Sequence, residues 1–337
     1  MGTLGLTPAG SLSEIVLDLL AQLPTEPVTP GLADAVAEIA GAVEDPLADD
    51  DLQLALYLAY ELHYRSFASV HPGWEWSPTL LGMRAALEET FFGALEAELP
   101  AAPADPERVG ETLFRLEAEA EGPSLSRHLE TSAELEQFRE FVIHRSLYQL
   151  KEADPHSWAI PRLRGAPKAA LLEVQHDEYG GGRPERMHSA LFAKTMRGLD
   201  LDDSENAYLG RVPGVTIATV NLMSGFGLHR SRRGAIVGHL AMFEMTSARP
   251  NRSYGNALRR FGLGPEVTDF YDEHVEADAV HENIAAYDMA GGLAREEPEL
   301  AADVLFGARA LLFLEGRFAR HLLGAWEHGE SSLCEPL

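Results

Sequence analysis

The chain has 337 residues, of which 45% are hydrophobic and 24% are charged, a composition typical of a globular protein with a sizeable core. Its 53 acidic and 27 basic residues give a formal net charge of −26, which argues against nucleic acid and anionic membranes as partners. The single cysteine, Cys334, excludes an intramolecular disulfide and a cysteine-based zinc or iron–sulfur site within one chain. Any metal is therefore expected to bind to histidine and carboxylate side chains.

The beginning of the chain does not resemble a targeting segment. Residues Met1–Leu23 have no positively charged start and are interrupted by Pro8, so they do not match a secretory signal peptide. No apolar run reaches the length of a membrane-spanning helix. We therefore expect a cytoplasmic protein.

Hydrophobic residues recur with helical rather than alternating spacing in nearly every long segment. The first series of predicted helices, separated by proline- and glycine-containing stretches, is Ser11–Leu23, Leu32–Val43, Leu52–Ser66, Pro78–Glu98, Pro106–Ala120 and Leu125–Glu130. The second series is Ala133–Glu152, Lys168–Glu178, Pro184–Met196, Ala207–Phe226, Arg233–Thr246, Ser253–Phe261, Glu266–Leu293 and Glu297–Glu327. Because no hairpin signature occurs, the sequence predicts an all-α fold.

A break in the helical pattern at Glu121-Gly122-Pro123 suggests a division of the chain. We expect residues 1–122 to form an N-terminal helical accessory region, and residues 123–337 to form the helical domain that carries the chemistry.

Three potential metal ligands share one face of a predicted C-terminal helix. His274, Asp278 and His281 lie at positions i, i+4 and i+7, and about 100° per residue places their side chains within roughly 60° of one another. Two imidazoles and a carboxylate suit iron, manganese or zinc. The alternative is a polar surface face on an acidic helix.

Other carboxylates and a histidine occur in apolar helical settings and could complete such a site. These residues are Glu152, Glu178, His188 and Glu244. Glu244 is the most informative, because a carboxylate between Phe243 and Met245 is costly to bury without a partner. A metal is one such partner, and an arginine from another helix is the alternative. Helical bundles build dinuclear metal sites from inward-facing residues of these types.

Glu173 and His176 form an i, i+3 pair that could also chelate a metal, and spacing alone does not separate this pair from Glu178 and His188. A ferritin-like site would need the Glu-x-x-His pair on two helices, and the chain contains only one copy. Glu61 and His63 point to different helix faces, so we expect them to be polar residues of a packed core.

Taken in order, these residues resemble the haem-oxygenase-like diiron oxidases and oxygenases, a family of iron-containing redox enzymes, and among them the central domain of an N-nitrosating member. The matching positions are Glu152, Glu178 in Asp-Glu-Tyr-Gly, His188, Glu244 and the His-x3-Asp-x2-His motif of His274, Asp278 and His281. The resemblance covers roughly residues 130–330. It implies a haem-oxygenase-like helical bundle, with an additional N-terminal helical region found in some longer members.

The resemblance also implies which residues bind metal. Glu152, Asp278 and His281 would bind one iron, while Glu178, His188 and His274 would bind the other. Glu244 would bridge the two ions or bind when both are present. The resemblance implies weakly held iron and no haem.

The implied activity is that of an Fe(II)- and O₂-dependent oxidase or oxygenase that acts on a small molecule. N-oxygenation of an amine or amino-acid-derived substrate is placed ahead of oxidative carbon–carbon cleavage of a fatty or amino acid. We expect His176 and Tyr179 to lie beside the ligands, and Arg230, Arg232 or Arg233 to bind a substrate carboxylate. The basic cluster that contains these arginines could instead be a solvated loop.

The expected partners are a small-molecule substrate and, as options, an external electron donor and a second copy of the chain in a homodimer. Two other functional classes stay open. The protein could be a ferroxidase or iron store, or a helical binding protein whose acidic residues and histidines are ion-paired.

Overall fold

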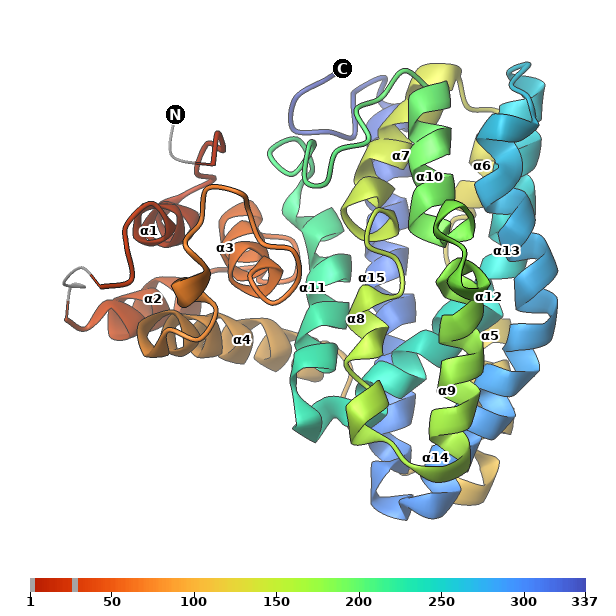
Figure 1. The fold of residues 1–337 in the computed structure, drawn as a ribbon, viewed down its shortest axis with the longest axis horizontal. Coiled ribbons are helices and arrows are strands. Elements are labelled where there is room, and N and C mark those ends of the chain that lie inside the picture. Colours follow the sequence, from red (N-terminus) through yellow and green to blue (C-terminus); the bar gives the residue numbers. More distant parts are fainter. Residues whose placement is uncertain (1–3, 26–29) are drawn as a thin grey trace. The chain divides into compact units, whose positions relative to one another are not determined.

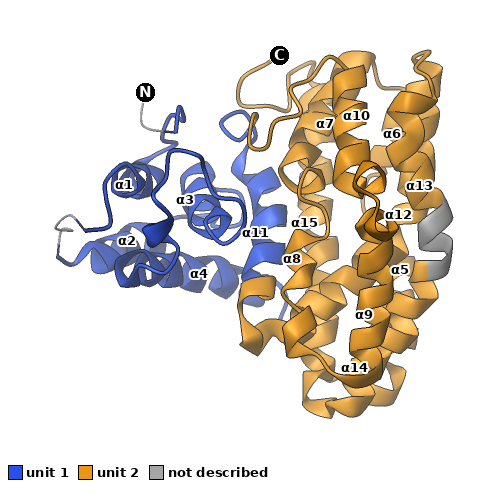
Figure 2. Cartoon of the chain, in the orientation of Figure 1, with its two compact units in different colours: residues 1–100, 209–225 blue, residues 101–208, 226–337 orange. Residues whose placement is uncertain are grey.

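The computed structural model describes residues 4–25 and 30–337, and for residues 276–280 it describes the backbone but not the side chains. The all-α prediction is confirmed, because the described residues form helices and turns and contain no strand. The chain forms two compact units, which Figure 2 colours separately. Unit 1 comprises residues 1–100 and 209–225, and unit 2 comprises residues 101–208 and 226–337. The division expected at residue 122 stays a prediction about domains.

Unit 1 is a small helical assembly whose buried centre is α3. Its helices are α1 (Ser11–Leu20), α2 (Leu32–Gly41), α3 (Asp50–Glu61), α4 (Pro78–Glu98) and most of α11 (Gly214–Leu228). The Asp51 carboxylate at the start of α3 accepts hydrogen bonds from the first turn of α1, at 2.8 Å from Leu12 N and 2.7 Å from Ser13 N. These bonds satisfy helix N–H groups that have no partner within α1.

Glu61 and His63 are buried in unit 1, as their spacing predicted. His63 Nε2 lies 2.7 Å from Arg84 Nη1, and its Nδ1 lies 3.4 Å from a Glu75 carboxylate oxygen. The two residues therefore belong to the polar part of the core of unit 1.

Unit 2 contains the longer helices, most of which run along a common direction in Figure 1. They are α5 (Val109–Ala118), α6 (Leu125–Thr131), α7 (Leu135–Gln149), α8 (Asp154–Ser157), α9 (Gly165–Glu178), α10 (His188–Gly198), α12 (Arg233–Arg260), α13 (Pro265–Asn283), α14 (Gly291–Glu296) and α15 (Ala301–Glu327). Helix α12 packs against both α13 and α15, and α10 packs against α7 and α13. Among the described residues, no helix has both the length and the apolar character needed to cross a membrane.

Two glycines allow α12 and α15 to approach closely. A Cβ atom on Gly238 would lie 1.8 Å from the Val304 carbonyl oxygen, and one on Gly307 would lie 1.9 Å from the Ala235 carbonyl oxygen. Because these contacts are reciprocal, they fix the register of the two helices, and Glu244 follows Gly238 by less than two turns of α12.

Several helix boundaries differ from those expected from the sequence, and three of the differences lie near the candidate ligands. Helix α7 ends at Gln149, so Glu152 lies in a turn beyond it rather than on the helix. The helices predicted on either side of Pro250 are one helix, α12, with Pro250 inside it. Helix α13 ends at Asn283, and residues Ile284–Ala290 continue it as a π-helix, which the sequence pattern did not indicate.

Candidate metal centre

Glu152 lies in a turn with unusual backbone geometry. Ala153, the next residue, has a φ of 74° in the left-handed region, which is unfavourable for a residue with a Cβ atom. Its carbonyl oxygen accepts hydrogen bonds from Gln175 Nε2 at 3.1 Å and from Ser157 Oγ at 3.3 Å. These contacts hold the turn in place and thereby orient Glu152 toward the interior, where its side chain is buried.

Glu178 is the last residue of α9, and a glycine turn follows it. Gly180 has a φ of +67°, and a Cβ atom there would lie 2.5 Å from the backbone of Arg186. This position therefore requires glycine. The resulting close approach brings residues 184–187, and with them the start of α10, back against the end of α9.

His188 is the first residue of α10, and its ring is buried beside Glu178 and His274. Its Nδ1 lies 3.2 Å from Glu178 Oε2, and the centres of the His188 and His274 rings are 4.3 Å apart. Burial, together with the nearby His274, lowers the pKa of His188 to about 3. In the neutral form that this pKa implies, His188 has a lone pair with which it can bind a metal.

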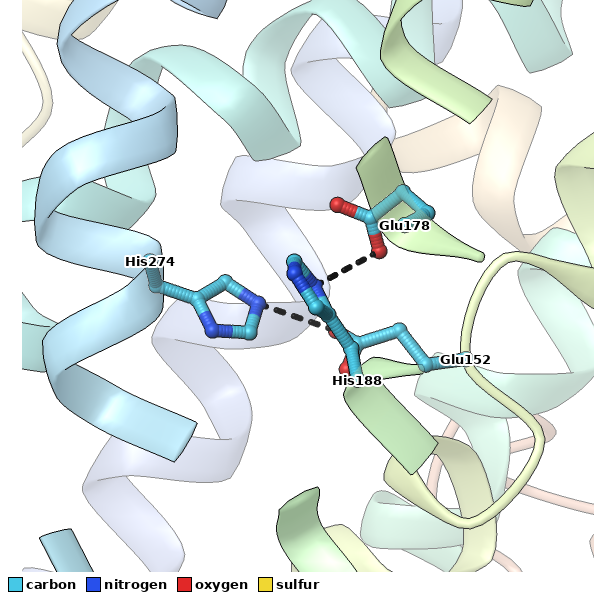
Figure 3. Close-up of side chains that lie close together, drawn as sticks. All are labelled: Glu152, Glu178, His188 and His274. Carbon is cyan, nitrogen blue, oxygen red and sulfur yellow. Dashed lines mark ion pairs between the residues drawn. The ribbon is translucent and has the colours of Figure 1, made fainter. Parts of the chain in front are cut away.

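His274 projects from α13 toward Glu152, as Figure 3 shows. Its Nδ1 lies 2.8 Å from the Phe270 carbonyl oxygen, which can only accept a hydrogen bond, so Nδ1 carries the proton and donates it. The neutral ring then has its lone pair on Nε2, which lies 3.5 Å from Glu152 Oε1. Metal-binding histidines are oriented by this kind of bond to a backbone carbonyl.

Among the side chains that the structure describes, two groups have the arrangement needed to bind a metal ion. The first consists of Glu152, Glu178, His188 and His274, and the second of Glu178, Glu244 and His281. Within each group one potential ligand atom per residue lies within 4.8 Å of the others, and every residue is buried. Figure 3 shows how the first group converges from three helices and the turn after α7. Glu178 belongs to both groups.

His281 contacts a carboxylate at each ring nitrogen. Nδ1 lies 3.2 Å from Glu244 Oε2, and Nε2 lies 3.0 Å from Asp177 Oδ2. Burial acts to lower the pKa of His281, but the contacts with Glu244 and Asp177 outweigh it and raise the pKa to about 9. The sequence reasoning did not identify Asp177, although its position next to Glu178 was a usable signal.

The buried carboxylates and histidines fit a cationic metal. Burial raises the pKa of both Glu152 and Glu244, and the neighbouring Glu178 raises it further. Glu152 and His188 lie close to His274 and Glu178, but neither carboxylate oxygen of Glu152 nor His188 Nδ1 forms a hydrogen bond of normal geometry with a described residue. Unpaired buried polar atoms are unfavourable, and an ion bound between them would satisfy them. Carboxylate and imidazole ligands together suit iron.

Several other predicted residues lie away from these groups or cannot be placed. Glu173 and His176 are exposed on the opposite face of α9 and belong to neither group. Asp278 is one of the five residues whose side chains are not described. Arg233 forms an ion pair with Glu297, and with Arg230 and Arg232 it lies at the start of α12, about 16 Å or more along the helix from Glu244.

Tyr179 lies close to the ligands without belonging to either group. Its hydroxyl donates a hydrogen bond to Asp154 Oδ1 at 2.7 Å and lies 2.9 Å from Ser157 Oγ. It thus connects the end of α9 to the turn that carries Glu152.

The grouping of ligands by distance differs from the one that the resemblance implied. Glu152 lies with His188 and His274, and Glu178 rather than Glu244 is shared by the two groups.

A family model described as iron-containing redox enzyme matches residues 139–316. The matched stretch covers more than half of the chain and includes every residue of both ligand groups. No curated protein matched the chain.

Proposed function

Because the chain belongs to the family of iron-containing redox enzymes, with a haem-oxygenase-like helical bundle, we propose that unit 2 binds two iron ions and uses O₂ to oxidise a small organic molecule. The observation that carries this proposal is the pair of buried ligand groups that share Glu178. A shared carboxylate between two ligand sets is the arrangement expected of a dinuclear centre. The carboxylate-rich set also suits non-haem iron better than a porphyrin with one axial histidine.

The protein side chains would hold and orient the metal ions. Glu152, His188 and His274 would bind one ion, Glu244 and His281 the other, and Glu178 both. Asp278, predicted from the His-x3-Asp-x2-His motif, is proposed as a further ligand on sequence grounds alone. When bound, two ferrous ions would supply electrons for the reduction of O₂, which is the oxidant for the substrate.

The surrounding residues would fix the ligands and keep bulk water out. The Phe270 carbonyl holds the proton of His274 on Nδ1, and Asp177 accepts a hydrogen bond from His281 Nε2. His281 Nδ1 would then have to lose its proton before it binds a metal, so iron binding is expected to release a proton. The Phe270 ring packs against the His188 and His274 rings, Phe192 packs against Phe270, and these rings would exclude water from this side.

N-oxygenation of an amine or amino-acid-derived molecule is the reaction we propose first. Oxidative carbon–carbon cleavage of a fatty or amino acid by the same centre is the alternative. An aromatic cavity beside the ligand groups supports an organic substrate over simple iron storage or oxidation. An external electron donor, a homodimeric state and a cytoplasmic location stay predictions.

The test is O₂ consumption by the full-length protein after anaerobic loading with Fe(II). We expect candidate amines to accelerate O₂ uptake and to gain oxygen, as detected by mass spectrometry. Glu178→Ala should abolish this activity because both ligand groups lose a member, whereas Glu173→Ala, an exposed change on the same helix, should preserve it. If uptake stops once the added Fe(II) is oxidised and no amine or acid alters it, the protein is a ferroxidase and the oxygenase proposal is wrong.

A further inference from the structure

Unit 2 contains a cavity of about 230 Å³ between α7, α10, α12, α13 and α15. An apolar cavity of about 150 Å³ is enough for a benzene molecule, so this one has room for an aromatic ring and a short chain. Six of its fifteen lining residues are aromatic: Phe141, Tyr148, Phe192, Phe243, Tyr254 and Tyr271.

One end of the cavity lies beside the ligand groups. Tyr148 on α7 precedes Glu152, in the turn after that helix, by four residues. On three other helices a lining residue lies within about one turn of a metal ligand: Phe192 and His188, Phe243 and Glu244, Tyr271 and His274. At this end Tyr148, Phe192 and Tyr271 are buried. Burial raises the pKa of the Tyr148 hydroxyl, and the nearby Glu152 and Glu178 raise it further, which agrees with a position next to the ligands.

The other end of the cavity carries an ion pair. Arg145 donates two hydrogen bonds to Glu315, with Nη1 2.8 Å from Oε1 and Nη2 2.6 Å from Oε2. Arg145 lies about one turn before Tyr148 and Gln149 on α7, which ends before the turn that carries Glu152. The side chains of Arg145 and Glu315 are 20% and 29% exposed, so this end of the cavity reaches solvent and can serve as an entrance.

We propose that this cavity binds an α-amino acid, with the charged head group on the Arg145–Glu315 pair and an aromatic or apolar side chain directed toward the ligand groups. The inference rests on the proposed function, because it names the substrate class of that same site. Arg145 would bind the substrate carboxylate through N–H groups that Glu315 does not use, and Glu315 would accept a hydrogen bond from the substrate ammonium.

The net charge of the entrance favours a zwitterion over a simple anion or cation. Arg145 and Glu315 already neutralise each other, so a ligand with a single charge would leave that charge uncompensated in a poorly solvated place. A zwitterion adds no net charge and offers one partner to each side chain. The Arg230–Arg233 segment lacks this relation to the cavity, because none of its residues lines it.

A lining residue near the inner end indicates what the substrate side chain carries. Gln149 lies three residues before Glu152, and its Oε1 is buried without a hydrogen-bond partner among the described residues. An uncharged N–H group on the substrate, such as that of an indole or an arylamine, would satisfy this oxygen.

The test is isothermal titration calorimetry of the full-length protein, loaded with Fe(II) and kept anaerobic. The probes are L-tryptophan, tryptamine, which lacks the carboxylate, and 3-indolepropionate, which lacks the ammonium group. We expect L-tryptophan to bind at least about tenfold more tightly than either analogue, because each charged hydrogen bond contributes to affinity. Equal affinity for the three probes, or binding of none of them, would overturn the proposal.

Substitutions assign the two charges. Arg145→Gln should remove the preference for L-tryptophan over tryptamine, and Glu315→Gln should remove the preference over 3-indolepropionate. Arg139→Gln, a change on the same helix that does not line the cavity, should leave all three affinities unchanged. If Arg145→Gln keeps the wild-type order of affinities, Arg145 does not bind the carboxylate.

Two controls separate this proposal from a folding defect and from the metal proposal. The double variant Arg145→Gln/Glu315→Gln leaves no unpaired buried charge, so it should fold even if a single variant does not, and should lose both preferences. Iron content measured in the same samples tests the metal proposal independently. If the protein binds two irons but binds the three probes with equal affinity, only the head-group assignment is refuted. If the probes bind in the expected order but the protein binds no iron, only the metal centre is refuted.

Discussion

Glu178 is the residue on which the proposed centre depends most, because both ligand groups contain it. Its spacing from His188 did not distinguish it from the rival pair of Glu173 and His176. The apolar pattern of α9 does distinguish them: Leu171, Val174 and Glu178 lie on one buried face, while Glu173 and His176 are exposed. Reading each candidate against the apolar face of its own helix would have resolved the choice from the sequence.

Tyr179 illustrates how a residue outside the ligand groups can control one of the ligands. Its hydroxyl bonds with Asp154 and Ser157 connect α9 to the turn that presents Glu152. We expect Tyr179→Phe to weaken Fe(II) binding about tenfold, as is typical when a side chain that supports a ligand is removed. Anaerobic Fe(II) titration measures this change.

Tyr208→Phe provides the matched control for that prediction. Its hydroxyl also takes part in a hydrogen bond, from the Asp202 backbone N–H at 2.8 Å, but it contacts no ligand residue among those described. If Tyr179→Phe binds Fe(II) as tightly as Tyr208→Phe and the wild type, the turn that carries Glu152 does not depend on Tyr179.

At the scale of elements, helical periodicity predicted nearly all the helices but not the ways in which they end. Glu152 was expected at the end of a helix, yet it lies in a turn whose geometry depends on contacts from α9, distant in sequence. Pro250 was expected to separate two helices, yet packing of α12 against α13 and α15 keeps it within one. Local sequence carries no record of such tertiary contacts, and for the same reason the π-helix after α13 was not predicted.

The close packing of α12 against α15 yields a prediction about stability. Gly238→Ala would place a methyl group on the Val304 carbonyl oxygen and force the helices apart. We expect a loss of about 3 kcal/mol or more in the free energy of unfolding, as is typical of overpacked cores. Chemical denaturation of the metal-free protein measures it.

Gly324→Ala on α15 is the corresponding control. A Cβ atom at this position meets nothing within 4 Å, so the change should be neutral or stabilise the helix by up to about 1 kcal/mol. Equal stabilities for the Gly238→Ala and Gly324→Ala proteins would show that the contact between α12 and α15 tolerates an added methyl group.

For the whole molecule, both ligand groups and the aromatic cavity belong to unit 2. Unit 1 is not a continuous segment, because residues 209–225 belong to it while the chain on either side belongs to unit 2. A truncation at residue 100 would therefore leave part of unit 1 without the helices it packs with. The sequence pattern suggested a single boundary near residue 122 and gave no sign that residues 209–225 belong to unit 1.

The overall charge is consistent with a protein that binds cations in its interior. The formal net charge is −26, and the two ligand groups bury three glutamates. Composition alone did not locate this buried charge, because most of the 53 acidic residues could lie on the surface. It was the apolar surroundings of Glu244 that indicated a buried carboxylate in need of a partner.

The most direct test of the account is the number of Fe(II) ions bound by the full-length protein under anaerobic conditions, measured by equilibrium dialysis and metal analysis. The wild type should bind two ions per chain. Glu244→Ala should retain one, because the group of Glu152, Glu178, His188 and His274 stays complete, while Glu178→Ala should lose affinity for both. A wild type that binds no iron, or a Glu178→Ala protein that still binds two ions with unchanged affinity, would contradict the account.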